Sequence, residues 1–186
     1  ALVGDDPAAK SSTLPSASEP TLAALQVPVL YPGDVQEAVD LVRHAAALSR
    51  VSGLWAAVKV VTAVADAHGT VRLAPERVRP VRPERAWPAG APYRHRPNAR
   101  ILPPTNLELE RSLVEVRLPL AVDYLRANGF RVYIVSGGGI DLMRTFSQDV
   151  YGVAPDNVVG SSGKVKYTHQ TSYPMSTYLV AFSAHR

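Results

Sequence analysis

The chain has 186 residues, of which 46% are hydrophobic and 19% charged, and its net charge is +4. This composition is ordinary for one globular domain or two small ones. The absence of cysteine excludes disulfides, thiolate metal sites, iron–sulfur ligation and a cysteine nucleophile. No apolar run reaches the ~18–20 residues that span a bilayer, because Lys59 interrupts the longest one, and no signal peptide pattern opens the sequence. We therefore expect a cytoplasmic protein without a membrane partner.

The first 30 residues predict two short strands joined by a loop. Residues 2–7 have the pattern of a strand that runs into a loop, and residues 7–20 are rich in Pro, Ser, Ala and Thr. Residues 27–30 form a short apolar run before a Pro-Gly pair, which is typical of a buried strand.

Four polar residues in this region are candidate ligands of a bound molecule. Asp5, Asp6, Ser11 and Ser12 follow the first predicted strand, and α/β sheets place their ligands at strand ends. A plain polar loop is the alternative interpretation.

Residues 34–50 predict a helix. Asp34 is a good N-cap, and Glu37 three residues later completes a capping-box pattern. Small and apolar side chains recur at helical spacing and predict the buried face, namely Val35, Val39, Val42, Ala46 and Ser49, reinforced by Ala38, Ala45 and Leu48. Residues 54–65 then suit a buried strand by their valine content, although their alanines also allow a helix, and residues 67–70 form a turn.

Residues 71–104 predict an irregular connector rich in proline and arginine. Prolines recur throughout 75–104 and exclude a regular helix. Its arginines are interleaved with these prolines, which favours a solvated arm over a nucleic-acid contact; they are Arg72, Arg77, Arg79, Arg82, Arg85, Arg94, Arg96 and Arg100.

A second helical region begins at Thr105, whose hydroxyl can cap a helix with Glu108 three residues later. Pro119 must kink or divide this helix, because proline lacks an amide hydrogen and crowds the preceding turn. Asn128 followed by Gly129 is a helix-ending pattern.

The segment after this helix carries the candidate phosphate site. A strand is predicted over 130–135, a three-glycine turn at 137–139 and a helix over 140–151, followed by a short strand at 157–159. Turn amides and a helix N-terminus can together hold an anion. The candidate residues are Ser136, Gly137, Gly138, Gly139 and Lys164, and the alternative is a tight strand–helix connection in which the glycines only avoid clashes.

These elements predict an α/β fold in three layers, with a mostly parallel, doubly wound sheet and the irregular connector. The expected parts are an α/β segment at 1–70, the connector at 71–104, a second α/β segment at 105–170 and a C-terminal strand or tail at 171–186. The five histidines lack metal-ligand spacing, and no Asp-x-Asp pair occurs. We expect His44 to be a packed or surface residue of helix 34–50.

Residues 1–127 resemble part of the large subunit of indolepyruvate (2-oxoacid) ferredoxin oxidoreductases, which use thiamine diphosphate. Four strings carry the resemblance: GDDPAAKSSTLPSASEPTLAAL, VPVLYPGDVQEAVDLVRHAAALSR, SGLWAAVKVVTAVADA and RHRPNARILPPTNLELERSLVEVRLPLA. It implies a pyrimidine-binding domain whose loop, with Asp5, Asp6, Ser11 and Ser12, lies near the cofactor. The family's Gly-Asp-Gly magnesium motif and its cysteines do not occur here, so thiamine diphosphate and Mg²⁺ are implied by resemblance only and the isolated chain is expected to bind no cofactor.

Residues 123–167 look instead like haloacid-dehalogenase-type phosphatases, in which the position of Ser136 holds the phosphoryl group. The family's other motifs, including its nucleophilic aspartate, have no counterpart here. Residues 172–182, SYPMSTYLVAF, are weakly similar to zinc aminopeptidases without their His-Glu-x-x-His site.

Three resemblances in one chain predict a chimeric or artificial sequence, or an altered natural fragment. We expect no self-contained catalytic activity, with a Ser136 phosphatase and an arginine-arm binding module as the alternatives. Because a thiamine-enzyme helix normally packs on parts that are missing here, its apolar stripe predicts self-association or a new partner.

Overall fold

The computed structural model describes residues 1–84, 105–168 and 179–183, with side chains up to residue 163. It divides into two compact units, Ala1–Phe130 and Arg131–Arg186. The division falls after the second helical region, whereas composition suggested boundaries at 70, 104 and 170. Several residues considered above lie outside the described residues, namely Arg85, Arg94, His95, Arg96, Arg100, His169 and His185.

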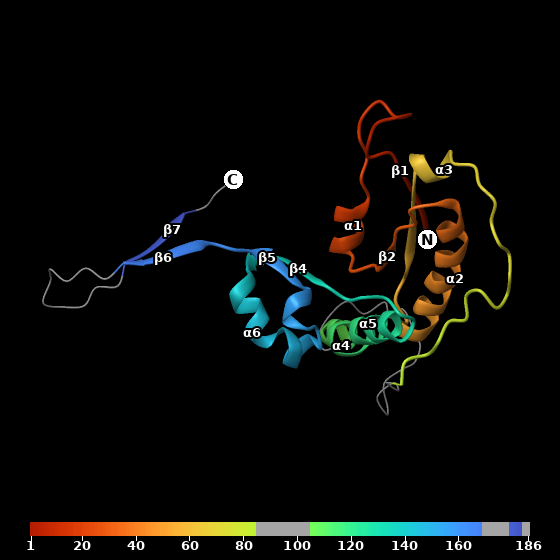
Figure 1. Cartoon of the computed structure of the whole chain (residues 1–186). Coiled ribbons are helices and arrows are strands. Elements are labelled where there is room, and N and C mark those ends of the chain that lie inside the picture. Colours follow the sequence, from red (N-terminus) through yellow and green to blue (C-terminus); the bar gives the residue numbers. More distant parts are fainter. Residues whose placement is uncertain (85–104, 169–178, 184–186) are drawn as a thin grey trace, which may run out of the picture. The chain divides into compact units, whose positions relative to one another are not determined.

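The first unit is built on a three-stranded parallel sheet. Its strands β1 (Leu2–Asp5), β2 (Val29–Leu30) and β3 (Ala57–Val61) are ordered β1-β3-β2, so that β3 is central. Helices α1 (Glu19–Ala24) and α2 (Val35–Ser52) lie on opposite sides of this sheet (Figure 1). The strands expected at both ends of the first loop are confirmed, but α1 was not predicted.

Helix α2 confirms the predicted capping. The Asp34 carboxylate accepts a hydrogen bond from the Glu37 amide at 2.8 Å, and the Glu37 carboxylate accepts one from the Gly33 amide at 2.8 Å. The helix ends at Gly53, whose φ of 70° is accessible to glycine without strain. Sequence and structure agree here because the caps are local interactions.

The predicted buried face of α2 is confirmed for Ala45 and Leu48 and wrong for Val42. The side chains that the helix buries are Ala45, Leu48 and Ser52, whereas Val42 of the expected stripe is 45% exposed. Helix α2 carries apolar side chains around more than one face, so periodicity alone cannot select the face that meets β3. The core of the unit consists of Leu30, Ala45, Leu48, Leu54, Ala56, Val58, Ala121 and Tyr124.

The strand that was predicted over residues 54–65 covers only Ala57–Val61 in the structure. Strand β3 ends at Val61, which lies opposite Asp5, the last residue of β1. Residues Thr62–Ala65 form the short helix α3. Beyond Val61 the chain has no neighbouring strand to pair with, and the Thr-Ala-Val-Ala sequence can turn helical.

The described part of the connector, residues 71–84, lies along α2 and has no regular structure, as predicted. Gln36 accepts a hydrogen bond from the Arg72 amide at 2.7 Å, and the Arg77 side chain pairs with Asp40 at 2.9 Å. Asn128 binds both the amide and the carbonyl group of Val81, at 2.8 and 2.9 Å. Polar contacts therefore attach residues 72–81 to α2 and to Asn128.

Pro119 divides the second helical region, as expected. Helix α4 (Thr105–Ser112) continues into a π-helical turn, η1 (Leu113–Arg117), and then into α5 (Leu118–Ala127), where proline occupies the first turn. The Leu118 amide bonds the Leu113 carbonyl group, five residues back. This wider turn lies just before Pro119, which lacks an amide hydrogen, and lets the chain continue as a helix beyond it. Asn128 and Gly129 end α5, with Gly129 at a φ of 81°.

Helix α5 packs on α2 through a His–Tyr pair. Tyr124 is fully buried, and its hydroxyl lies 2.9 Å from Nδ1 of His44. Burial raises the pKa of Tyr124 to about 12 and lowers the pKa of His44 from its ordinary value of 6.5. His44 is thus a packed residue, as expected.

The His44 pair predicts that acidification weakens the first unit. Because the folded pKa is lowered, neutral His44 contributes stability above pH 6.5, and this contribution is lost as the pH falls through the folded value. We expect the urea midpoint followed by tyrosine and tryptophan fluorescence to drop between pH 7 and 5. His44→Gln should reduce that drop and His68→Gln, at an exposed histidine, should retain it. An equal drop in all three proteins would contradict the prediction.

The second unit contains a parallel pair of strands and one helix. Strands β4 (Ile134–Gly139) and β5 (Val158–Ser161) pair with a register shift between Val135 and Gly139. Helix α6 (Ile140–Tyr151) begins directly after β4, and a 3₁₀ turn, η2 (Pro155–Asn157), leads into β5. Strands β6 (Lys164–Thr168) and β7 (Leu179–Ser183) form an antiparallel pair.

The predicted three-glycine turn is wrong. Strand β4 runs through residues 137–139 and the helix starts without an intervening turn; the only described glycines with positive φ are Gly53, Gly129 and Gly152. Close approach occurs at Gly160 instead, where an added Cβ would meet the Gly138 carbonyl oxygen at 2.9 Å. In place of the predicted turn, the β4–β5 pair has an irregularity between Val135 and Gly139, where its register shifts.

The described residues form a mixed α/β structure with small parallel sheets. Strand β4 does not join β3, since the three sheets have separate strand sets. Among the helices in the described part of the chain, none is long and apolar enough to cross a membrane.

Candidate functional site

A buried lysine and two carboxylates form a polar cluster in the first unit. Lys59, in the middle of β3, lies with its ammonium 3.3 Å from the Asp5 carboxylate and also pairs with Glu19 at the start of α1. The side chains of Lys59 and Asp5 are 2% and 3% exposed, and the Glu19 side chain is 45% exposed. The ammonium lies 4.9 Å from the centre of the Tyr31 ring, a cation–π distance.

The register of the sheet explains this meeting. Val3 lies opposite Lys59 and Asp5 opposite Val61 in the parallel pair. Alternate residues of a strand point to the same face, so Asp5 and Lys59 share the face that α1 covers. Burial would lower the pKa of Lys59, but its bonds to Glu19 and Asp5 outweigh burial and raise it. The ammonium stays charged inside the protein because two carboxylates enclose it.

Asp5 is engaged by the chain's own donors. Its carboxylate accepts hydrogen bonds from the Ser18 hydroxyl at 2.6 Å and the Ser18 amide at 2.8 Å, besides its contact with Lys59. The Ser18 hydroxyl and then Lys59 lower the pKa of Asp5 against the opposing effect of burial. Asp5 therefore links the end of β1 to the start of α1.

Asp6 organises the loop that follows. Its carboxylate accepts three consecutive amides, from Lys10 at 2.9 Å, Ser11 at 2.7 Å and Ser12 at 2.8 Å. These bonds, that from Ser11 first, lower the pKa of Asp6 to about 2. Ser11 and Ser12 take part through their main chain, and both residues are exposed. The four candidate residues of this loop are thus close together, with the loop's own amides around Asp6.

Ser136 lies in β4, close to the start of α6. Its hydroxyl accepts a hydrogen bond from the Gly138 amide at 3.0 Å, so one donor expected to face an anion already has a partner. Gly137 accepts a bond from the Ser161 hydroxyl at 3.0 Å, and Gly137 to Gly139 are exposed. Asp141 adds a carboxylate to the first turn of α6, where it opposes an anion.

Lys164, the remaining phosphate candidate, is the first residue of β6 and lies opposite Ser183 of β7. Its side chain is outside the described set. Groups of three or more histidine, aspartate or glutamate side chains suited to a metal ion are absent from the described residues.

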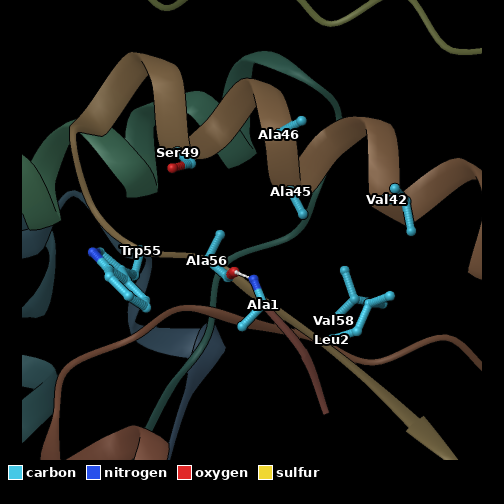
Figure 2. A pocket seen from close by; sticks show the side chains of 9 residues that line it. All are labelled: Ala1, Leu2, Val42, Ala45, Ala46, Ser49, Trp55, Ala56 and Val58. Carbon is cyan, nitrogen blue, oxygen red and sulfur yellow. Dashed lines mark hydrogen bonds between the residues drawn. The ribbon is translucent and has the colours of Figure 1, made fainter.

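An open apolar groove of about 530 Å³ lies beside α2. Figure 2 shows Val42, Ala46 and Ser49 of the helix above Leu2 and Val58 of the sheet, with Trp55 at one end. Leu2 is 76% and Trp55 78% exposed. Val42, Ala46 and Ser49, three residues of the stripe that the sequence assigned to the core, therefore line this groove.

Sequence reasoning missed the Lys59 cluster. A lysine between valines in a run predicted to be buried was the available signal, because a buried lysine requires a carboxylate partner. Lys59 was considered only as the residue that interrupts the longest apolar run. Glu19 gave no signal, because it lies in a segment that was predicted to be a loop.

No protein-family model matches the chain, and searches of the curated proteins and of the solved structures found no match.

Proposed function

We propose that the chain has no self-contained catalytic activity and that its first unit is a scaffold segment like that of a thiamine diphosphate-dependent indolepyruvate ferredoxin oxidoreductase subunit. One observation carries this proposal: Asp5 and Asp6, the carboxylates at the end of β1, are held by Ser18, Lys59 and the amides of residues 10–12. Their oxygens serve the fold instead of a cofactor or magnesium ion.

The resemblance of residues 1–127 supports the same proposal. A sheet of three parallel strands is small, and parallel sheets are normally covered on both faces. In a larger protein, further elements would complete the three-layer, doubly wound arrangement and cover the groove beside α2. The three separate resemblances support a composite or artificial origin, which one uninterrupted gene for all 186 residues at the source locus would contradict.

A titration with cofactor tests this proposal. Isothermal calorimetry of the chain with thiamine diphosphate and Mg²⁺ should give only heats of dilution, because Asp5 and Asp6 already have internal partners. The same titration with Asp6→Asn tests whether any binding of thiamine diphosphate and Mg²⁺ depends on the Asp6 carboxylate. Saturable heat with the unchanged chain, lost in Asp6→Asn, would refute the scaffold role.

The phosphatase alternative depends on Ser136, whose hydroxyl is bonded to Gly138. We expect no hydrolysis of p-nitrophenyl phosphate above a buffer blank with Mg²⁺, because the aspartate nucleophile of that family has no counterpart. Turnover that Ser136→Ala abolishes and Ser161→Ala retains would establish the alternative.

Two partner proposals remain. We propose self-association through exposed apolar side chains, such as Leu2 and Trp55; a sedimentation coefficient that does not change with concentration would count against it. The binding-module alternative uses the arginine arm, but Arg77 already pairs with Asp40. DNA binding with a steep salt dependence would revive that alternative.

A further inference from the structure

Helix α1 is attached to the sheet mainly by charge. This six-residue helix, described in full, buries none of its side chains, and Leu22 is its one partly buried apolar residue. Helices normally gain most of their stability from packing an apolar face. What α1 has instead are polar contacts at its N-terminal end: Glu19 pairs with the enclosed ammonium of Lys59, and its N-cap Ser18 donates two hydrogen bonds to the Asp5 carboxylate.

The segment that carries α1 also has two unusual backbone positions at its ends. Ala9 and Gln26 are the non-glycine residues with positive φ in the described chain, at 51° and 54°. Such residues hold a conformation that side chains disfavour. Gln26, which directly follows the C-cap of α1, can therefore relax when the helix leaves the sheet, whereas residues 10–12 stay bonded to the Asp6 carboxylate.

Release of the segment would uncover a lysine on the face of a parallel sheet. The Lys59 side chain is 2% exposed, and its ammonium contacts Glu19, Asp5 and the ring of Tyr31. Breaking the contact with Glu19 leaves the contact between Lys59 and Asp5 in place. The ion pair between Lys59 and Asp5 remains, and the ammonium of Lys59 becomes accessible where Glu19 contacted it.

From this geometry we infer that α1 is a lid closed by the Lys59–Glu19 ion pair together with the hydrogen bonds of Ser18 to Asp5, and that its opening exposes Lys59 to anionic solutes. The inference goes beyond the proposed scaffold role and does not depend on it. A permanent wall would instead be fixed by buried apolar side chains, which α1 lacks.

Hydrogen exchange followed by mass spectrometry tests the lid. In Glu19→Gln, we expect amides of the lid, such as those of Leu22 and Leu25, to exchange about tenfold faster, a change that corresponds to about 1.4 kcal/mol. Amides of α2 should keep their rates. Glu19→Asp, which keeps the charge on a shorter side chain, should give an intermediate rate.

The matched control is Asp66→Asn, which breaks an exposed ion pair with Lys10 elsewhere on the unit and should leave the lid unchanged. Labelling with an amine-reactive ester gives a second measurement. Lys59 should be protected relative to Lys10 in the unchanged chain and labelled faster in Glu19→Gln. Unchanged lid exchange in Glu19→Gln, or equal acceleration of α2 and the lid, would overturn the inference, as would rapid labelling of Lys59 in the unchanged chain.

Discussion

Replacing Lys59 with methionine is expected to destabilise the first unit by about 3 kcal/mol, because it leaves the Asp5 carboxylate without its cation. Asp5 is 3% exposed in its side chain and cannot regain water without opening the sheet. The lower end of the usual range for breaking a buried pair applies because Glu19, the second partner, is 45% exposed. The measurement is urea unfolding followed by tryptophan fluorescence at pH 7.

Lysine at position 10 provides the control for this experiment. Lys10→Met removes an ion pair with Asp66 in which both side chains are more than half exposed, so we expect its urea midpoint to stay close to that of the unchanged chain. The double variant Lys59→Met with Asp5→Leu should recover much of the loss, since it removes the unpaired charge as well. Equal midpoints for Lys59→Met and Lys10→Met would show that the buried pair is unimportant.

Leu48→Ala is expected to destabilise the same unit by about 2–5 kcal/mol, the usual cost of emptying a packed leucine site. Leu48 is fully buried and belongs to the cluster formed by α2, β3 and α5. Circular dichroism during thermal unfolding, together with urea denaturation, measures the loss.

Val42→Ala on the same helix is the matched control, because Val42 is 45% exposed and lines the groove. We expect a loss below about 1 kcal/mol, since little apolar area leaves the core. If Val42→Ala were the more damaging change, the packing of α2 described above would be wrong.

Local interactions account for the parts of the fold that the sequence predicted well. The start of α2 at Asp34, the end of α5 at Gly129 and the break at Pro119 each depend on residues within one helical turn. Capping geometry and the missing amide of proline act in the same way in any fold. These features could therefore be assigned without knowing what packs on the helices.

Tertiary pairing decided what the sequence left open. The end of β3 at Val61 follows from the length of β1, and the passage of β4 through Gly139 follows from its pairing with Ser161. Periodicity placed both Leu48 and Val42 on the apolar face of α2, and only the packing decides that Leu48 meets the core and Val42 does not. For the same reason Asp5 and Asp6 were recognised as neighbours of one loop, whereas the meeting of Lys59 with Glu19, 40 residues apart, required the folded sheet.

The sequence by itself thus determined the helix boundaries set by caps and proline, and the polar residues that follow β1. Only the tertiary structure decided which side chains enclose Lys59, and that the oxygens of Asp5 and Asp6 are taken up by donors of the same chain. The physical reason is range: a cap is made within one turn, whereas a buried ion pair forms only where strand register brings distant residues onto one face.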